Sequence, residues 1–242
     1  MIKSLLFIIT TISFIVSSEA KRLEVLFLGD NGSHKPSERF PQIMQGLGPR
    51  GVNFTYTSDP NCLHDGTLEQ FDALMIFANI GKISEEQEKG ILDYVYNGGA
   101  FLPIHCASYC FLNSMKYVKL VGAQFKSHGA GIFTTDIKKP DHPIMKGYKG
   151  FETWDETYVH RLGTNDRNVL QTREGEPWTW TREPGKGRVF YTAYGHDQRT
   201  WGNPGFHDLV HRGLLWAIGE EKSKEFLSSE IPNLVRRDGD LV

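Results

Sequence analysis

Several apolar runs in the sequence end in a histidine or a carboxylate, and these residues are the best suited to chemistry. The pattern occurs at Asp30 and His34 after LEVLFLG, at His105 after AFLPI, at Asp155 and Glu156 in ETWDETYVH, and at His196 and Asp197 after RVFYTAYG. In open α/β sheets, ligands bind outside the carboxyl ends of the strands. If the strands before His34, His105 and His196 are parallel, the three imidazoles converge on one crevice.

Two kinds of chemistry suit three imidazoles and a carboxylate at one place. Neutral imidazole nitrogens and a carboxylate oxygen would bind one divalent metal ion, such as zinc, manganese or iron. Alternatively, a histidine that titrates near neutrality beside Glu156 or Asp197 would act as a general base. No two of these residues have a tight spacing such as HExxH, so both kinds of chemistry stay open. The catalytic candidates are His105, His196 and Glu156, and the metal-ligand candidates are His34, His105 and His196.

A fourth histidine and the tryptophans are further site candidates. His128 lies in QFKSHGAG, which we expect to be a glycine-flanked loop that closes over the crevice and adds a ligand or a proton shuttle. An aromatic face complements the apolar C–H face of a pyranose. The candidate sugar-binding residues are therefore Trp154, Trp178, Trp180 and Trp201, with Asp197 beside them, and core packing is the alternative for the indoles.

The remaining reactive side chains carry weaker signals. His207 and His211 are an i,i+4 pair on a predicted helix over 204–221, and we expect both on its solvated side. The three cysteines, Cys62, Cys106 and Cys110, are too few for a disulfide framework. Cys106 and Cys110 would lie one helical turn apart as small buried side chains.

The elements that must position these residues alternate between strands and helices. The patterns predict strands over 22–30, 52–59, 71–79 and 100–105, with helices over 37–51 and 84–99, the latter capped by Ser84. Shorter, partly antiparallel strands are predicted over 131–137, 157–162, 168–172, 178–183 and 187–194. The order predicts one α/β domain with a three-layer, flavodoxin-like sheet that is mostly parallel and has antiparallel additions in its second half.

Charge and motif content exclude several functions. The net charge of −2 over 242 residues gives no electrostatic basis for binding nucleic acid. The first turn lacks GxGxxG, and the chain has neither a phosphate-binding loop nor a GxSxG elbow. We therefore expect no nucleotide cofactor.

The first twenty residues have the pattern of a secretory signal peptide. A lysine at position 3 precedes the apolar run SLLFIITTISFIV, and Ser18 and Ala20 have the small-residue spacing of a cleavage site. We predict cleavage after Ala20, a periplasmic or extracellular protein, and no stable membrane insertion afterwards. The mature chain, 21–242, would comprise a core over about 22–220 and a tail over 221–242.

Five segments together resemble the ThuA (trehalose utilisation) family: GGAFLPIHCAS, GAQFKSHG, DHPI, WDETY and, most specifically, GRVFYTAYGHDQRTWGNPGFHDLVHRGLLWA. The resemblance implies the class I glutamine amidotransferase-like fold. It also implies that His105 stands where an amidotransferase has its nucleophilic cysteine, and that His196 resembles the late histidine of that pair. Amidotransferase activity is therefore not expected.

The family link is to the use of disaccharides, notably trehalose and sugars oxidised at ring carbon three. The leading hypothesis is an exported carbohydrate-active hydrolase or lyase that acts on a small carbohydrate, a glycoside, disaccharide or keto-sugar. One alternative is a non-catalytic sugar-binding module. Another is a residual Cys–His hydrolase centred on Cys106. The sequence predicts no oligomeric state.

Overall fold

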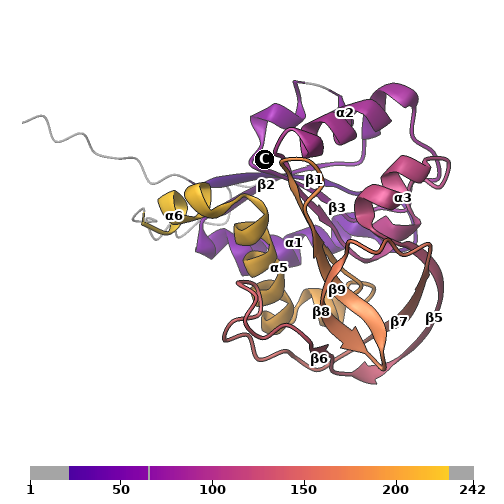
Figure 1. The fold of residues 1–242 in the computed structure, drawn as a ribbon, viewed down its shortest axis with the longest axis vertical. Helices are drawn as coiled ribbons and strands as arrows, with labels where there is room; N and C mark the ends of the chain where they lie inside the picture. Colours follow the sequence, from indigo (N-terminus) through magenta and orange to yellow (C-terminus); the bar gives the residue numbers. More distant parts are fainter. Residues whose placement is uncertain (1–21, 65, 229–242) are drawn as a thin grey trace, which may run out of the picture.

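A mixed β-sheet forms the centre of the protein (Figure 1). The structure is a computed structural model that describes residues 22–64 and 66–228. Within these ranges, eight strands form one sheet in the order β2-β1-β3-β4-β10-β9-β8-β6. Their bounds are β1 Leu23–Leu28, β2 Val52–Thr57, β3 Ala73–Ile76, β4 Ala100–Pro103, β6 Asp136–Ile137, β8 Asn168–Arg173, β9 Glu176–Arg182 and β10 Arg188–Thr192. Strands β2, β1, β3, β4 and β10 are parallel, and β9, β8 and β6 extend the sheet antiparallel. The predicted fold class is confirmed.

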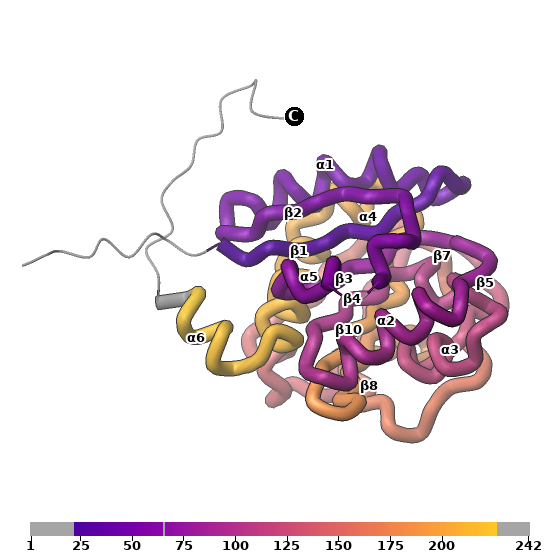
Figure 2. Tube along the Cα trace, turned by 90° about the horizontal axis from the view of Figure 1, so that it is seen from above, coloured from indigo at the N-terminus to yellow at the C-terminus, as the bar shows by residue number. Residues whose placement is uncertain are grey.

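Helices cover both faces of the sheet (Figures 1 and 2). The strand order runs outward in opposite directions from β1 and β3, so right-handed crossovers put α1 and α2 on opposite faces. Helix α5 packs beside α1, against β4 and β10, and α3 packs beside α2. The helices are α1 Pro36–Leu47, α2 Glu85–Tyr96, α3 Met115–Val121, α4 Gln198–Trp201, α5 Pro204–Ala217 and α6 Glu220–Ser228, with short 3-10 helices η1 Gly48–Arg50, η2 Pro60–Leu63, η3 Leu68–Gln70 and η4 His105–Tyr109.

Local sequence explains the first half of the fold well. Strand β3, ALMI, is buried along its whole length, as expected of a parallel strand covered on both faces. Helix α2 begins with a capping box, in which Ser84 accepts from the Gln87 N–H and the Gln87 side chain accepts from the Ser84 N–H. Three glutamates in its first turn face the positive end of the helix dipole.

The parallel strands bring the predicted site residues to one edge of the sheet. β1, β4 and β10 run in the same direction, so the segments that follow them meet at the carboxyl edge. A parallel bridge between Ile104 and Thr192 continues the β4–β10 pairing to the position just before His105. The predicted convergence of His34, His105 and His196 is confirmed.

A separate antiparallel ribbon lies against this edge, and it differs from the prediction. The segment around His128 is not a loop but strand β5, Gln124–Phe133, which pairs with β7, Thr153–Arg161. Its small residues and glycines favour a loop locally, whereas pairing with the distant β7 makes it a strand. The ribbon carries both His128 and Glu156.

Two further predictions about helices need correction. After β4 the chain forms the 3-10 helix η4 rather than an α-helix, so Cys106 and Cys110 do not lie one α-helical turn apart. The predicted helix over 204–221 is instead two helices, α5 and α6, and the second extends into the expected tail. The predicted signal peptide and residues 229–242 lie outside the described ranges. Among the described residues, none of the helices has the length and apolar character needed to cross a membrane.

Candidate metal centre

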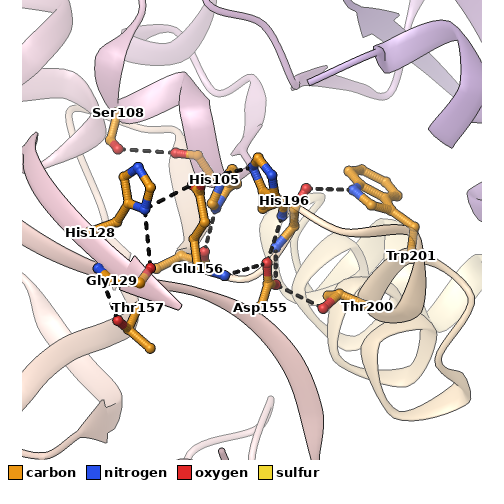
Figure 3. Close-up of polar contacts among 12 residues, drawn as sticks. His105, Ser108, His128, Gly129, Asp155, Glu156, Thr157, His196, Thr200 and Trp201 are labelled. Atoms are coloured by element: carbon orange, nitrogen blue, oxygen red, sulfur yellow. Dashed lines mark hydrogen bonds and ion pairs between the residues drawn. The ribbon is translucent and has the colours of Figure 1, made fainter. Parts of the chain in front are cut away.

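Four side chains converge at the carboxyl edge of the sheet. His34, His105, Glu156 and His196 each offer one ligand atom, and these atoms all lie within 4.8 Å of one another. They come from the turn before α1, the start of η4, strand β7 and the turn after β10. Segments far apart in the chain therefore build one centre, of which Figure 3 shows His105, Glu156 and His196.

His105 stands at a sharp turn with its ring orientation fixed. Its φ of 49° lies in the left-handed region that non-glycine residues rarely adopt. The buried ring has Nδ1 2.6 Å from the Ala193 carbonyl oxygen. Because that oxygen only accepts, Nδ1 carries the proton, and in the neutral ring Nε2 keeps a lone pair. Tyr158 stacks on the ring, with centroids 4.0 Å apart.

Glu156 lies between two of the histidines. Its Oε2 is 3.3 Å from His105 Nε2, and its Oε1 is 3.1 Å from His196 Nδ1. Neither approach has the alignment of a hydrogen bond, so both nitrogens are buried without a hydrogen-bond partner. Burial pushes the pKa of Glu156 upward, but the two imidazoles outweigh it and hold the pKa well below its usual range. The carboxylate in turn raises the pKa of His196.

His34 completes the group as a neutral imidazole. Its ring centroid lies 5.3 Å from that of His105 and 5.2 Å from that of His196. Burial, followed by the two neighbouring imidazoles, lowers its pKa to about 3. Its Nδ1 is buried with no hydrogen-bond partner. His34 is therefore unprotonated at neutral pH and keeps an unused lone pair.

Two aspartates hold the loops that carry the histidines. Buried Asp155 accepts hydrogen bonds from the backbone N–H groups of Gly195 at 2.8 Å and His196 at 3.0 Å, and from the Thr200 hydroxyl at 2.8 Å (Figure 3). Asp30 accepts from the Gly32 N–H at 2.7 Å and from the Asn79 N–H. Sequence reasoning noted both carboxylates but missed this role; their place beside predicted ligands was the available signal.

His128 lies at the mouth of the centre. Its side chain is 44% exposed, and its Nδ1 is 3.5 Å from Glu156 Oε1 (Figure 3). The same nitrogen is 3.1 Å from the Gly129 carbonyl oxygen, which can only accept. With the proton on Nδ1, Nε2 keeps a lone pair. His128 is thus beside the four-residue group without belonging to it.

A buried polar network that sequence reasoning missed supports the turn at His105. The Tyr191 hydroxyl lies 3.1 Å from the His105 carbonyl oxygen and 3.0 Å from Ser108 Oγ. His160 Nε2 is 3.0 Å from the same hydroxyl, and His160 Nδ1 is 3.1 Å from Glu176 Oε1. Polar partners on β7, β9 and β10 therefore fix the backbone that presents His105.

The tryptophan expectations need correction. Trp178, Trp180 and Trp201 are fully buried, so none of them presents a ring face to a sugar. Trp201 instead donates from Nε1 to the Gly195 carbonyl oxygen at 2.6 Å. Trp154 is partly exposed and has the Arg199 guanidinium 4.1 Å above its ring, with Asp197 paired to that arginine. Trp154 and Asp197 stay predictions.

The expected burial of Cys106 is confirmed, whereas the expectation for His207 is wrong. The Cys106 side chain is fully buried, and burial raises the pKa of its thiol well above the usual range, which disfavours the nucleophilic thiolate. A Cys–His pair with Cys106 is therefore not supported. His207 is not solvated but buried, with Nε2 2.6 Å from the Trp201 carbonyl oxygen, and His211 is half-buried.

Solved structures share this fold. A ThuA-like protein from Parabacteroides merdae has 20% identity and a TM-score of 0.71 over 88% of this chain and 94% of that chain. A ThuA-like protein from Bacteroides uniformis has 16% identity and a TM-score of 0.69 over 82% and 92%. A beta-galactosidase from Rahnella sp. R3 has 15% identity and a TM-score of 0.59 over 80% of this chain but 31% of that chain. At these identities the likeness shows the fold.

The comparison by sequence identifies the family. No curated protein matches the chain. The family profile ThuA, described as trehalose utilisation, matches residues 24–217, which is most of the chain and includes every residue of the centre. The chain therefore belongs to the ThuA family.

Proposed function

We propose that the protein is a metal-dependent enzyme that acts on a glycoside, disaccharide or keto-sugar. His34, His105, His196 and Glu156 would bind one divalent ion, zinc, manganese or iron. His128 would transfer protons at the mouth of the centre. The proposal joins the geometry of the four-residue group to the family's description as trehalose utilisation.

One observation carries the metal part of this proposal. His105 Nε2 and His196 Nδ1 lie 3.3 and 3.1 Å from the oxygens of Glu156, and both nitrogens are buried with no hydrogen-bond partner. Buried polar atoms are nearly always paired, and a lone pair that faces a carboxylate oxygen is unfavourable without a cation or a proton between them. A proton would satisfy one of these two nitrogens, whereas one divalent ion would satisfy both and would also accept a lone pair from His34.

The donor set fits such an ion. Nitrogen ligands about 2.1 Å from a metal lie about 3.4 Å apart in a tetrahedron and about 4.2 Å apart across an octahedron. The four ligand atoms all lie within 4.8 Å of one another, so small side-chain rotations would bring them to these separations. The bond from His105 Nδ1 to the Ala193 carbonyl is the outer contact typical of a metal-binding histidine, because it directs the free Nε2 inward.

The chemistry follows from the residues around the centre. The ion would supply a Lewis acid that polarises a carbonyl or glycosidic oxygen. A keto group acidifies the neighbouring ring C–H, and His128 Nε2 is free to take that proton. His128 would then return the proton to the departing oxygen as the C–O bond breaks, which completes an elimination. Addition of water to the resulting double bond would be the reverse type of step.

An activity screen tests the proposal. The protein would be treated with a chelator, reloaded with zinc, manganese or iron(II), and incubated with trehalose, lactose and their 3-keto derivatives while release of monosaccharide is measured. We expect turnover that disappears on chelation and in His105→Ala. Sugar binding without turnover, unchanged by the chelator, would instead support a sugar-binding module. We also propose that the protein works outside the cytoplasm, after cleavage at Ala20; N-terminal sequencing of the exported chain tests this.

A further inference from the structure

Aromatic rings form a continuous contact from the surface to the metal centre. Tyr109 on η4 is 37% exposed, and its ring centroid lies 5.3 Å from that of Phe125 on β5. Phe125 lies 4.5 Å from Tyr158, which stacks on His105 at 4.0 Å. We call Tyr109 and Phe125 the aromatic ledge. Its two rings lie on the side of the centre that also carries His128.

An irregularity in strand β5 puts Phe125 and His128 on the same side. In a regular strand, residues three apart point to opposite faces. The register with β7 shifts between Phe125 and Ser127, so one extra residue reverses the alternation. Both rings consequently approach Tyr158, Phe125 at 4.5 Å and His128 at 6.3 Å, and they lie 5.9 Å from each other.

We propose that the aromatic ledge is a stacking subsite for one pyranose ring of the substrate. This inference rests on the carbohydrate part of the proposed function and names how the sugar is held. The two rings stand at 80° to each other, so the apolar C–H face of a pyranose would lie on the exposed ring of Tyr109, with Phe125 along one side of the sugar. The hydroxyl edge of the sugar would face His128. The ledge would provide the ring stacking on a sugar that the buried tryptophans cannot provide.

The chemistry of the ledge favours a sugar. A small carbohydrate needs an apolar face with polar groups at its rim, and the exposed His128 and the Tyr109 hydroxyl provide donors and acceptors beside two rings. The adjacent centre sets the direction: a ring on the ledge would direct its next linkage toward Glu156 and His128. The bond to be broken would then lie at the centre.

Binding measurements on variants test the ledge. Titration calorimetry would measure Kd for trehalose, lactose and methyl α-glucoside with the wild-type protein, Tyr109→Ala and Phe125→Leu, which keeps an apolar side chain but removes the ring. Tyr96→Ala is the matched control, because Tyr96 is 51% exposed at the end of α2, near the opposite edge of the sheet. Loss of ring stacking predicts a Kd raised about 3- to 10-fold in both ledge variants.

The outcomes separate the ledge from the metal centre. The inference is supported if Tyr109→Ala and Phe125→Leu weaken binding while Tyr96→Ala and the metal content stay as in the wild type. It is overturned if both ledge variants bind as the wild type does, or if no probe sugar binds the metal-loaded protein. If the wild-type protein binds sugar without metal, and the ledge variants lose sugar affinity, the proposed metal centre is contradicted and the stacking subsite is supported.

Discussion

Glu156 Oε2 lies 3.3 Å from His105 Nε2, the ring nitrogen that the Ala193 carbonyl leaves without a proton in the neutral imidazole. The pair does not have the alignment of a hydrogen bond. With a neutral imidazole, two electron-rich atoms would face each other in a buried place, next to two more imidazoles. The proposed divalent ion would account for this contact and for the buried nitrogens together.

Glu156→Gln should weaken metal binding strongly. The substitution keeps the size of the side chain but removes the negative charge and one oxygen acceptor. Loss of outer contacts alone costs about 10- to 100-fold in metal affinity, so loss of a direct ligand should exceed this range. Competition titration with a chromophoric chelator measures the affinity. Glu38→Gln, at an exposed glutamate on α1, is the control, and equal affinities in both variants would exclude Glu156 as a ligand.

Asp155→Asn should destabilise the fold as well as the centre. The buried carboxylate holds the Gly195 and His196 N–H groups and the Thr200 hydroxyl, and an amide nitrogen in place of one oxygen cannot accept them. Loss of charge-assisted hydrogen bonds predicts a decrease of about 2–4 kcal/mol in the free energy of unfolding. Urea unfolding of the metal-free protein measures it. Asp136→Asn, at an exposed position, should change stability by less than about 0.5 kcal/mol; an equally small effect in Asp155→Asn would contradict the role.

Acid should destabilise the metal-free protein through its buried histidines. Burial lowers the pKa of His34 to about 3 and that of His211 to about 4, against 6.5 in the unfolded chain. The folded state then binds fewer protons than the unfolded state, so stability is complete above about pH 6.5 and is lost as the pH falls toward 4 and 3.

His211→Gln isolates one of these contributions away from the centre. Between pH 7 and 4.5, the free energy of unfolding should fall less steeply in the variant than in the wild type. The reason is that unfolding of the wild type takes up about one more proton, the one that His211 binds in the unfolded chain. A slope equal to that of the wild type would show that His211 is not buried in its neutral form.

His128→Gln should separate proton transfer from metal binding. The side chain lies beside Glu156 at the mouth, so its loss should leave the metal content unchanged while turnover falls by about 10²- to 10⁴-fold. Loss of metal from this variant would make His128 a ligand instead of a proton carrier.

Local patterns were sufficient to predict the parallel half of the fold. The apolar run of β3 and the capping residues Ser84 and Gln87 act through neighbours in the sequence, so they are readable from it. The convergence of His34, His105 and His196 follows from the direction of the strands that precede them. Glu156 was found for the same reason, as a carboxylate next to a predicted strand.

The features that could not be predicted from the sequence depend on contacts between residues far apart in the chain. Strand β5 exists because it pairs with β7, and its glycines taken alone indicate a loop. The register shift that aligns Phe125 with His128 depends on that partner. Trp178 and Trp201 could belong to a core or to a binding face by type alone, and only the packing around Phe133 and Phe77 decides for the core.

The metal content of the purified protein decides whether the four-residue group binds a metal ion. It is measured by elemental mass spectrometry on residues 21–242 without a histidine tag. The wild type and a His64→Ala control, whose histidine lies outside the four-residue group, should each contain about one equivalent of zinc, manganese or iron. His105→Ala and His196→Ala should lose it while remaining folded by circular dichroism. A folded wild-type protein that takes up no divalent metal, even after incubation with each of the three ions, would contradict the account.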